Sequence, residues 1–370
     1  MRYESKSIRR GDDNRMEAYV LHDIDDLRYE QADTPEIKEG WALVEVMAAG
    51  ICESDIPRIF ELGTYQFPTI PGHEFAGIVR QVGFSEDKKL VGKKVGIYPL
   101  IPCRECNNCR KEHYELCTNY DYLGSRRNGC FAEYVEIPVW NLIELPDEVS
   151  FAEAAMLEPM ATALHALRRL PFQEIKSIAI FGADFMNLLL AQWARLFGIQ
   201  DIYIIAEQQE QAGLAAELGF SLVCNTAAVN AVDWLKMQTG DAGVDAAVEG
   251  VGKSSIMEQC ILSVTAQGTI LTFANPNEDM HLDRDVYWKI SRKQLNIIGT
   301  WNSSFSTSVE NDWQDAIDML VERKIDTISL VTHNYPFREL KEGLQVMRDK
   351  SEFYGKILFS KSIKTRMGGM

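Results

Sequence analysis

The chain has 370 residues, enough for two domains of ordinary size, and its 46% hydrophobic and 25% charged residues are typical of a globular protein. Its formal net charge of −16 argues against nucleic acid and an anionic membrane surface as partners, because both bind basic surfaces. The sequence has no signal-peptide core near its N-terminus and no apolar run approaching about 18 residues, so we expect a cytoplasmic protein without a membrane partner.

The first part of the chain is rich in short strand patterns. Residues 1–15 are almost wholly polar and predict a flexible extension. From residue 16 to about 150, apolar-alternating stretches such as 18–21, 42–46 and 77–82 are separated by Gly, Pro and Asp turns. This pattern is typical of an all-β, barrel-like domain.

Helical periods begin after Pro146, first over 151–169. Strand patterns then alternate with helical ones, at 178–181, 202–205, 246–249, 269–273 and 296–299. Such an alternation predicts a parallel, doubly wound α/β sheet.

The last part of the chain returns to shorter elements, with a helix over 313–323 and a strand over 356–359, and we expect it to pack back onto the first domain. The predicted fold class is therefore α/β with a second, β-rich domain. The β-rich domain would comprise residues 16–160 and 302–362, and the doubly wound domain residues 161–301.

Four of the eight cysteines fall within fifteen residues at the spacing C-x2-C-x2-C-x7-C: Cys103, Cys106, Cys109 and Cys117. Four thiolates close a tetrahedron around Zn²⁺ and leave no position for a substrate, so the spacing predicts a structural zinc site. Disulfides or unrelated buried cysteines are the alternative, which a cytosolic-looking sequence disfavours. Because the segment is polar and buries little apolar area, its folding should depend on the metal.

A second metal site is predicted upstream, where Cys52 is followed twenty-one residues later by His73 and Glu74. A thiolate, an imidazole and a carboxylate are ligand types that hold a catalytic zinc while leaving one coordination position open. Each residue alone is weak evidence, because a lone His or Cys is more often a core or surface residue. The nearby four-cysteine segment strengthens the prediction.

The order of the motifs resembles the zinc-dependent medium-chain dehydrogenases. The motifs are Cys52-Glu53-Ser54-Asp55, Gly72-His73-Glu74, the four-cysteine segment, Gly129 to Tyr134 and Leu157-Glu158-Pro159. Within that family, residues 54–60 and 124–129 resemble the galactitol-1-phosphate dehydrogenase branch, with sorbitol dehydrogenases further off. The resemblance covers Met16 to about Ser360. It implies a GroES-like catalytic domain, a Rossmann-type dinucleotide-binding domain and a homodimer or homotetramer.

The resemblance also implies roles for the metal-site residues. Cys52, His73 and Glu74 would bind the catalytic zinc, and Glu158 would approach it directly or through water. Asp55 would orient the imidazole of His73, as metal-bound imidazoles usually require. A turn cap is the alternative for Asp55.

The implied reaction is the reversible oxidation of a secondary alcohol of a polyol or polyol phosphate, with hydride transfer to NAD. Ser54 would pass the substrate's proton toward solvent. Arg58, Arg126 and Arg127 stand out in an acidic chain and could bind a phosphate, although surface arginines or subunit contacts are at least as consistent with the sequence. Tyr65 either lines the substrate pocket or is a packed aromatic residue.

The dinucleotide fingerprint is degenerate. After the strand 178–181 the sequence reads Gly182-Ala183-Asp184-Phe185-Met186-Asn187, and only the first of the three expected glycines remains. Asp184 adds a negative charge where the backbone should approach the pyrophosphate. Asn187 stands where helix and strand should pack closely. Ala206 occupies the position of the ribose-binding acid, with Glu207 one residue later.

Two interpretations therefore stay open. One is a divergent but working NAD site, which Glu249 and Thr300 favour because their loops resemble those that flank the nicotinamide in the family. The other is a zinc protein that binds or acts on a polyol-like ligand with a lost or altered dinucleotide site. Glu53, where the family commonly has Gly or a basic residue, favours the second.

Overall fold

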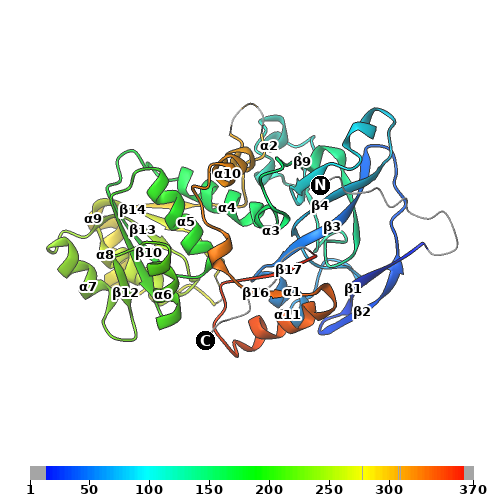
Figure 1. Cartoon of the computed structure of the whole chain (residues 1–370). Coiled ribbons are helices and arrows are strands. Elements are labelled where there is room, and N and C mark those ends of the chain that lie inside the picture. The colour runs from blue at the N-terminus through cyan, green and yellow to red at the C-terminus, as the bar shows by residue number, and fades with distance from the viewer. Residues whose placement is uncertain (1–13, 277, 307, 309, 362–370) are drawn as a thin grey trace. The chain divides into compact units, whose positions relative to one another are not determined.

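The computed structural model describes residues 14–276, 278–306, 308 and 310–361 (Figure 1). The chain forms two compact units. Unit 1 is Met1–Glu158, Ser304–Glu322 and Val331–Met370, and unit 2 is Pro159–Ser303 and Arg323–Leu330. The domain limits expected from the sequence stay a prediction. The extension predicted over residues 1–15 lies outside the described residues except for its last two, and its last residue already begins a strand.

Unit 1 is built on a seven-stranded sheet of order β16-β17-β3-β4-β5-β9, in which β8 also pairs with β3. All its pairs are antiparallel except β16 with β17. The strands of this sheet are β3 (Trp41–Ile51), β4 (Glu74–Val82), β5 (Lys94–Ile97), β8 (Tyr134–Pro138), β9 (Leu142–Glu144), β16 (Val331–Tyr335) and β17 (Lys356–Ser360).

Two short ribbons and five α-helices complete the named elements of unit 1 that bear on its sites. The ribbons are β1 (Arg15–Asp23) with β2 (Asp26–Asp33) and β6 (Leu100–Ile101) with β7 (Asp121–Tyr122). The helices are α1 (Asp55–Phe60), α2 (Asn107–Arg110), α3 (Phe151–Ala154), α10 (Asp312–Val321) and α11 (Leu340–Asp349).

Strand β3 is longer than the stretch 42–46 that alternation predicts, because it is central in the sheet. Nine of its eleven residues are buried, so both of its faces are covered and its sequence is almost continuously apolar. The core of the unit gathers around it and includes Val44, Ile51, Phe131 and Phe359. The prediction of a β-rich first domain is confirmed.

Unit 2 contains a six-stranded, wholly parallel sheet of order β12-β11-β10-β13-β14-β15. The strands are β10 (Ser177–Phe181), β11 (Asp201–Ala206), β12 (Val223–Asn225), β13 (Val244–Glu249), β14 (Val264–Thr272) and β15 (Asn296–Gly299). The helices after α4 (Leu157–Arg168) are α5 (Phe185–Leu196), α6 (Gln209–Glu217), α7 (Ala231–Thr239), α8 (Ser254–Ser263) and α9 (Arg284–Lys293). If the six strands are numbered along the chain, their order across the sheet is 3-2-1-4-5-6, which is the doubly wound arrangement predicted from the sequence.

The register of this sheet brings three loops together at one edge, namely the edge at which the strands end. Phe181, the last residue of β10, lies opposite Ile205 on one side and Glu249 on the other. The Gly182 N–H donates to the Ile205 carbonyl, and the Gly250 N–H donates to the Phe181 carbonyl. The loops after β10, β11 and β13 therefore begin side by side, where ligands bind in open parallel sheets.

The helix predicted over 151–169 is two helices, α3 and α4. Ser150 and Glu153 form a capping box at the start of α3, which ends at Ala154. The second helix restarts at Leu157, so that Pro159 falls in its first turn, where a missing N–H costs no hydrogen bond. Helix α5 begins at Phe185, because Asp184 caps it.

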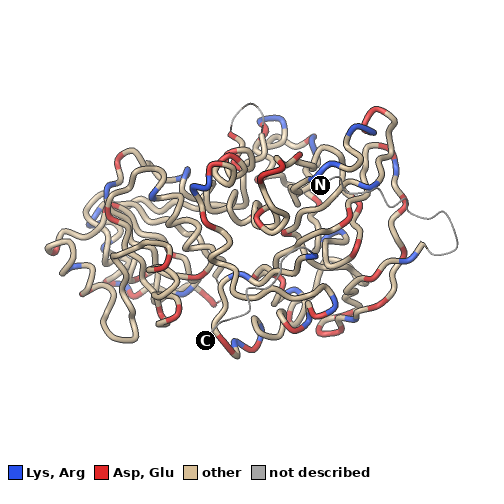
Figure 2. Tube along the Cα trace, viewed as in Figure 1, with Lys and Arg blue, Asp and Glu red and all other residues tan. Residues whose placement is uncertain are grey.

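Charged residues of both signs are interspersed along both units (Figure 2). Among the described residues, no helix combines the length and the apolar character that crossing a bilayer requires.

Candidate functional site

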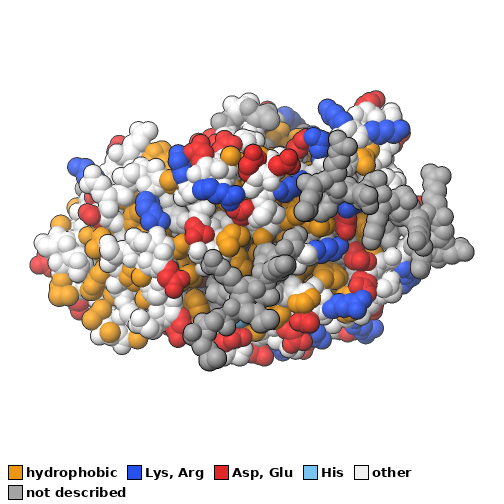
Figure 3. Space-filling view, in the orientation of Figure 1, with side chains coloured by type: hydrophobic (Ala, Val, Ile, Leu, Met, Phe, Trp, Pro, Cys, Tyr) orange, Lys and Arg blue, Asp and Glu red, His pale blue; other side chains and the backbone are white. Residues whose placement is uncertain are grey.

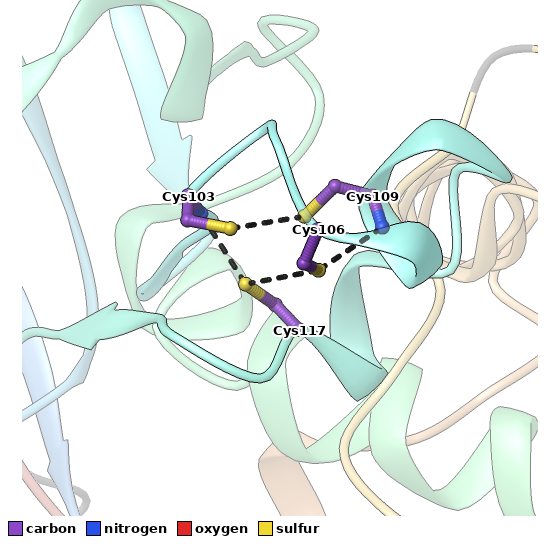
Figure 4. A group of neighbouring side chains, drawn as sticks. All are labelled: Cys103, Cys106, Cys109 and Cys117. Carbon is purple, nitrogen blue, oxygen red and sulfur yellow. Dashed lines mark hydrogen bonds between the residues drawn. The ribbon is translucent and has the colours of Figure 1, made fainter.

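The four cysteines predicted to bind structural zinc lie together in unit 1 (Figure 4). Their sulfur atoms all lie within 4.8 Å of one another. The Sγ atoms of Cys103 and Cys109 are 3.9 Å apart, and those of Cys106 and Cys117 are 4.0 Å apart. A tetrahedron with Zn–S bonds of about 2.3 Å has edges of about 3.8 Å. The donors therefore fit zinc, and all eight cysteines, which are all described, are free thiols.

Backbone N–H groups point at these sulfurs. The Cys109 N–H donates to Cys106 Sγ at the start of α2, and the Cys103 N–H donates to Cys117 Sγ, at 3.4 and 3.3 Å. Backbone N–H groups of Cys109 and Thr118 lower the pKa of the Cys106 thiol to about 5. Burial raises the pKa of Cys109, so a cation is needed to hold that residue as a thiolate.

Cys52, His73 and Glu74 form the second donor group, with ligand atoms within 4.8 Å of one another. The pairing of β3 with β4 explains how they meet: Gly50, near the end of β3, lies opposite Glu74, the first residue of β4. Residues just after one strand therefore lie beside residues that begin the next. Sulfur, nitrogen and oxygen donors at this spacing fit zinc.

Asp55 lies against the imidazole of His73 and is fully buried. Its Oδ1 is 3.4 Å from His73 Nδ1, and its Oδ2 accepts the Cys52 N–H at 3.0 Å. Burial lowers the pKa of His73, but the negative charge of Asp55 outweighs it and raises that pKa well above its usual value. With Nδ1 turned to Asp55, Nε2 is left for a metal. Asp55 also closes the turn after Cys52, and its role toward a metal-bound His73 stays a prediction.

Lys356 is a part of the centre that sequence reasoning missed. Its ammonium contacts Glu74 Oε2, and the side chains are only 4% and 1% exposed. Gly50 makes room for the pair, because a Cβ there would lie 2.4 Å from Glu74 Oε2. Lys356 enters through the antiparallel pairing of β17 with β3, in which Ile357 lies opposite Ile51. The sequence gives only a weak signal for this role, namely a lysine as the first residue of an apolar strand.

Glu158 is half-buried beside this centre but does not belong to the three-donor group. Its Oε1 accepts from the Tyr122 hydroxyl at 3.4 Å, and the ring of Tyr122 lies 5.6 Å from that of His73. Burial raises the pKa of Glu158, an effect that the charge of His73 opposes. Tyr122 is a second residue that sequence reasoning missed, because its position depends on the β6–β7 ribbon.

Ser54 and Arg58 extend the centre. The Ser54 hydroxyl donates to Cys52 Sγ at 3.2 Å, and Arg58 Nη1 donates to Ser54 Oγ at 3.0 Å. Arg58 also lies 3.7 Å from Asp55 Oδ1. The guanidinium of Arg58 is therefore engaged by Ser54 and Asp55, next to the metal ligand Cys52.

The other two candidate phosphate-binding arginines differ sharply. Arg127 forms ion pairs with Asp121 and Glu136. The guanidinium of Arg126 instead lies over the rings of Tyr65 and Tyr120, 4.2 and 4.3 Å from their centroids. Among the described residues Arg126 has no carboxylate partner. Arg126 is thus the arginine whose charge remains available to an anion.

In unit 2, the loop between β10 and α5, where the sequence places the dinucleotide fingerprint, is held by hydrogen bonds among its own residues and to the loop after β13. Asp184 Oδ1 accepts the Asn187 N–H at 2.9 Å, which caps α5, and also accepts from Asn187 Nδ2 at 3.0 Å. Asn187 Nδ2 donates in addition to the Gly250 carbonyl at 2.8 Å. Asn187 is 1% exposed. Its side chain therefore joins the start of α5 to the loop after β13.

These residues do not fit a pyrophosphate at the start of α5. A pyrophosphate needs free N–H groups and no negative charge there, whereas the Asp184 carboxylate already occupies the helix N-terminus. The space beside the two loop glycines is filled as well: a Cβ on Gly182 would lie 2.5 Å from Asn187 Nδ2, and one on Gly250 would lie 2.0 Å from Asn187 Oδ1.

The remaining predicted cofactor residues lie at the same edge of the sheet or near it. Glu249 Oε1 accepts the N–H groups of Val251 and Gly252, at 3.1 and 2.7 Å. The exposed Glu207 donates its own N–H to Gln211 Oε1 at 3.0 Å. Thr300 Oγ1 is buried without a hydrogen-bond partner among the described residues. Their roles toward a cofactor stay predictions.

Comparisons with known proteins agree with this architecture. Residues 38–147 match the alcohol dehydrogenase GroES-like domain, and residues 187–322 match the zinc-binding dehydrogenase family. Galactitol 1-phosphate 5-dehydrogenase of Escherichia coli K12 is 31% identical over 341 residues, covering 92% of this chain and 98% of the relative. Sorbitol dehydrogenase of Bacillus subtilis is 28% identical over 335 residues, covering 89% and 93%.

A solved structure gives the same answer. The crystal structure of galactitol-1-phosphate dehydrogenase from Escherichia coli superposes with a TM-score of 0.86 at 29% identity, covering 93% of this chain and 100% of that one. The fold, the two donor groups and the similarity over nearly the whole length agree, and the chain belongs to the zinc-dependent medium-chain dehydrogenases, in the polyol dehydrogenase family.

Proposed function

We propose that this chain is a zinc-dependent oxidoreductase that reversibly oxidises a secondary alcohol of a polyol or polyol phosphate to a ketone. The observation that carries the proposal is the group formed by the half-buried Cys52 and the buried His73 and Glu74, whose ligand atoms converge within 4.8 Å. The names of the relatives support the substrate class. NAD is the hydride acceptor that the family resemblance favours.

The residues of the chain have distinct tasks in this proposal. Cys52, His73 and Glu74 would hold the catalytic zinc, which when bound polarises the substrate's oxygen and lowers the pKa of its hydroxyl. Asp55 keeps the imidazole of His73 oriented. Ser54 Oγ would receive the hydroxyl proton and pass it toward solvent. Lys356 balances the charge of Glu74.

Metal analysis combined with product analysis tests this function. We expect two zinc ions per chain, a ketone formed from a secondary alcohol of a polyol, and loss of both one zinc and the activity in Cys52→Ser. Cys224→Ala, which removes a buried thiol in unit 2, is the matched control and should keep both. Two zinc ions with no ketone formed from any polyol or polyol phosphate would contradict the proposal.

We further propose Arg126 as the residue that binds the phosphate of a phosphorylated polyol. Two tyrosine rings hold its guanidinium in place, which lowers the entropy lost on binding an anion. Arg126→Ala should raise KM for the phosphate ester about tenfold or more and leave KM for the free polyol unchanged. Arg28→Ala, at an exposed ion pair, is the control. Equal loss for both substrates would refute the assignment.

The loop between β10 and α5 favours a second candidate function. In this alternative function, the chain binds or acts on a polyol-like ligand without exchanging hydride with free NAD. Asp184 and Asn187 favour this alternative because they occupy the start of α5. Titration with NADH and, separately, NADPH distinguishes the two: micromolar binding favours the dehydrogenase, and none at millimolar concentration favours the alternative.

We also infer a homodimer or homotetramer in the cytoplasm. Strand β15 lies at the edge of its sheet with Ile297 47% exposed, and Tyr287 and Trp288 on α9 are 60% and 57% exposed. Hydrophobic side chains are visible on the surface of unit 2 in Figure 3. An exposed edge strand flanked by apolar side chains favours pairing with another copy. Light scattering that gives a monomer mass would contradict the oligomer.

The cytoplasmic location is supported by the eight free thiols, which suit a reducing compartment.

A further inference from the structure

We propose that the side chains of Asp184 and Asn187 form a clasp that keeps the pyrophosphate of a free dinucleotide from the N-terminus of α5. The clasp is defined by three hydrogen bonds, two from Asn187 to Asp184 Oδ1 and one from Asn187 Nδ2 to the Gly250 carbonyl. The parallel sheet and its loops do not depend on these two side chains, so we expect their removal to increase binding of a dinucleotide. The inference deepens the second candidate function, in which the chain exchanges no hydride with free NAD, and it rests on the proposed function only for the choice of NADH as ligand.

The negative charge of Asp184 is the first reason to expect that a pyrophosphate is excluded from the start of α5. Its carboxylate accepts an N–H of the first turn of α5, which is the kind of donor that a phosphate oxygen would otherwise use. The helix dipole favours one anion at this end, and the protein supplies that anion itself. A pyrophosphate would therefore have to displace the carboxylate or bind beside it against like-charge repulsion.

The volume of Asn187 is the second reason, and it is independent of charge. The amide lies between Gly182 and Gly250, the first residues after β10 and β13. These are the two loops that meet at the edge of the parallel sheet, where a dinucleotide would cross. Because Asn187 is 1% exposed and bonded to both loops, the gap between them is closed by protein atoms.

The variants separate these two reasons. Asp184→Asn keeps the shape and removes the charge. Asn187→Ala removes the amide and keeps a good helix former. The double variant Asp184→Gly/Asn187→Ala removes both, and Gly is a tolerated N-cap, so the helix should persist. Asn230→Gly removes the cap of α7 in the same unit and serves as the control.

The test is a calorimetric titration of the full-length protein with NADH, with no alcohol present. We expect millimolar or weaker binding by the unmodified chain, a gain of about tenfold to a few hundredfold in the double variant, a smaller gain in Asp184→Asn, and no gain in Asn230→Gly. Micromolar binding by the unmodified chain, or nicotinamide nucleotide in its acid extract, would overturn the inference. So would equally weak binding by a folded double variant.

Failure of this inference is distinguishable from failure of the proposed function. A double variant that binds NADH and still forms no ketone from polyols would leave the clasp standing and remove the dehydrogenase. An unmodified chain that forms ketone with micromolar NAD would do the reverse.

Discussion

The buried pair of Lys356 and Glu74 offers a direct test of how the metal centre is held together. Lys356→Met removes the ammonium, keeps a side chain of similar length and leaves Glu74 without its partner at 1% exposure. Removing one partner of a buried ion pair costs about 3–5 kcal/mol, because the remaining charge stays desolvated. In the zinc-free protein we expect unit 1 to lose about that much stability, more than a hundredfold in its opening equilibrium.

Zinc should reduce this loss, because the cation replaces the missing positive charge beside Glu74. Hydrogen exchange on peptides from β3, β4 and β17 measures the opening of unit 1 separately from unit 2, in zinc-free and zinc-loaded protein. Glu74→Gln/Lys356→Met completes a double-mutant cycle and should recover part of the stability, since no lone charge stays buried.

The chain provides a matched control one residue beyond the same strand. Lys361 lies 3.0 Å from Glu45, with side chains 42% and 18% exposed, and Lys361→Met should cost only about 0–1 kcal/mol. If Lys356→Met in the zinc-free protein costs no more than Lys361→Met, the reasoning about the buried pair is refuted.

Two other predictions concern unit 1. Cys103→Ser should lower the zinc content from two ions per chain to one and make residues 103–117 sensitive to limited proteolysis, because four thiolates stabilise this polar segment through the metal; unchanged proteolysis would contradict the structural role. The partly buried Glu45 has a lowered pKa, since the charges of Lys361 and Arg80 outweigh its desolvation, so its ion pairs stabilise the fold above pH 4.5 and lose this effect as the pH falls through the lowered pKa. Glu45→Gln should therefore be less stable than the unmodified chain at pH 7, by about 1 kcal/mol, and nearly equal to it near pH 3 by urea unfolding; a difference that does not shrink would contradict this sign.

The local spacing of residues by itself determined much of this protein. The four cysteines from Cys103 to Cys117 lie within fifteen residues, so their spacing alone predicts that their sulfurs bind one ion. The alternation of strand and helix patterns likewise predicted the sheet of unit 2, because each strand and each crossover helix is coded within its own segment. Cys52, His73 and Glu74 were identified by donor type and by resemblance to a family.

Tertiary structure decided which distant side chains meet those residues. Lys356 reaches Glu74 only because β17 pairs with β3 in one register, and Tyr122 reaches Glu158 only through the β6–β7 ribbon. The sequence placed Asp184 and Asn187 at the positions of two missing glycines, but the bond from Asn187 to Gly250 depends on β13 lying beside β10. Strand register over long sequence separations is set by the packing of the whole core, and no short motif records it.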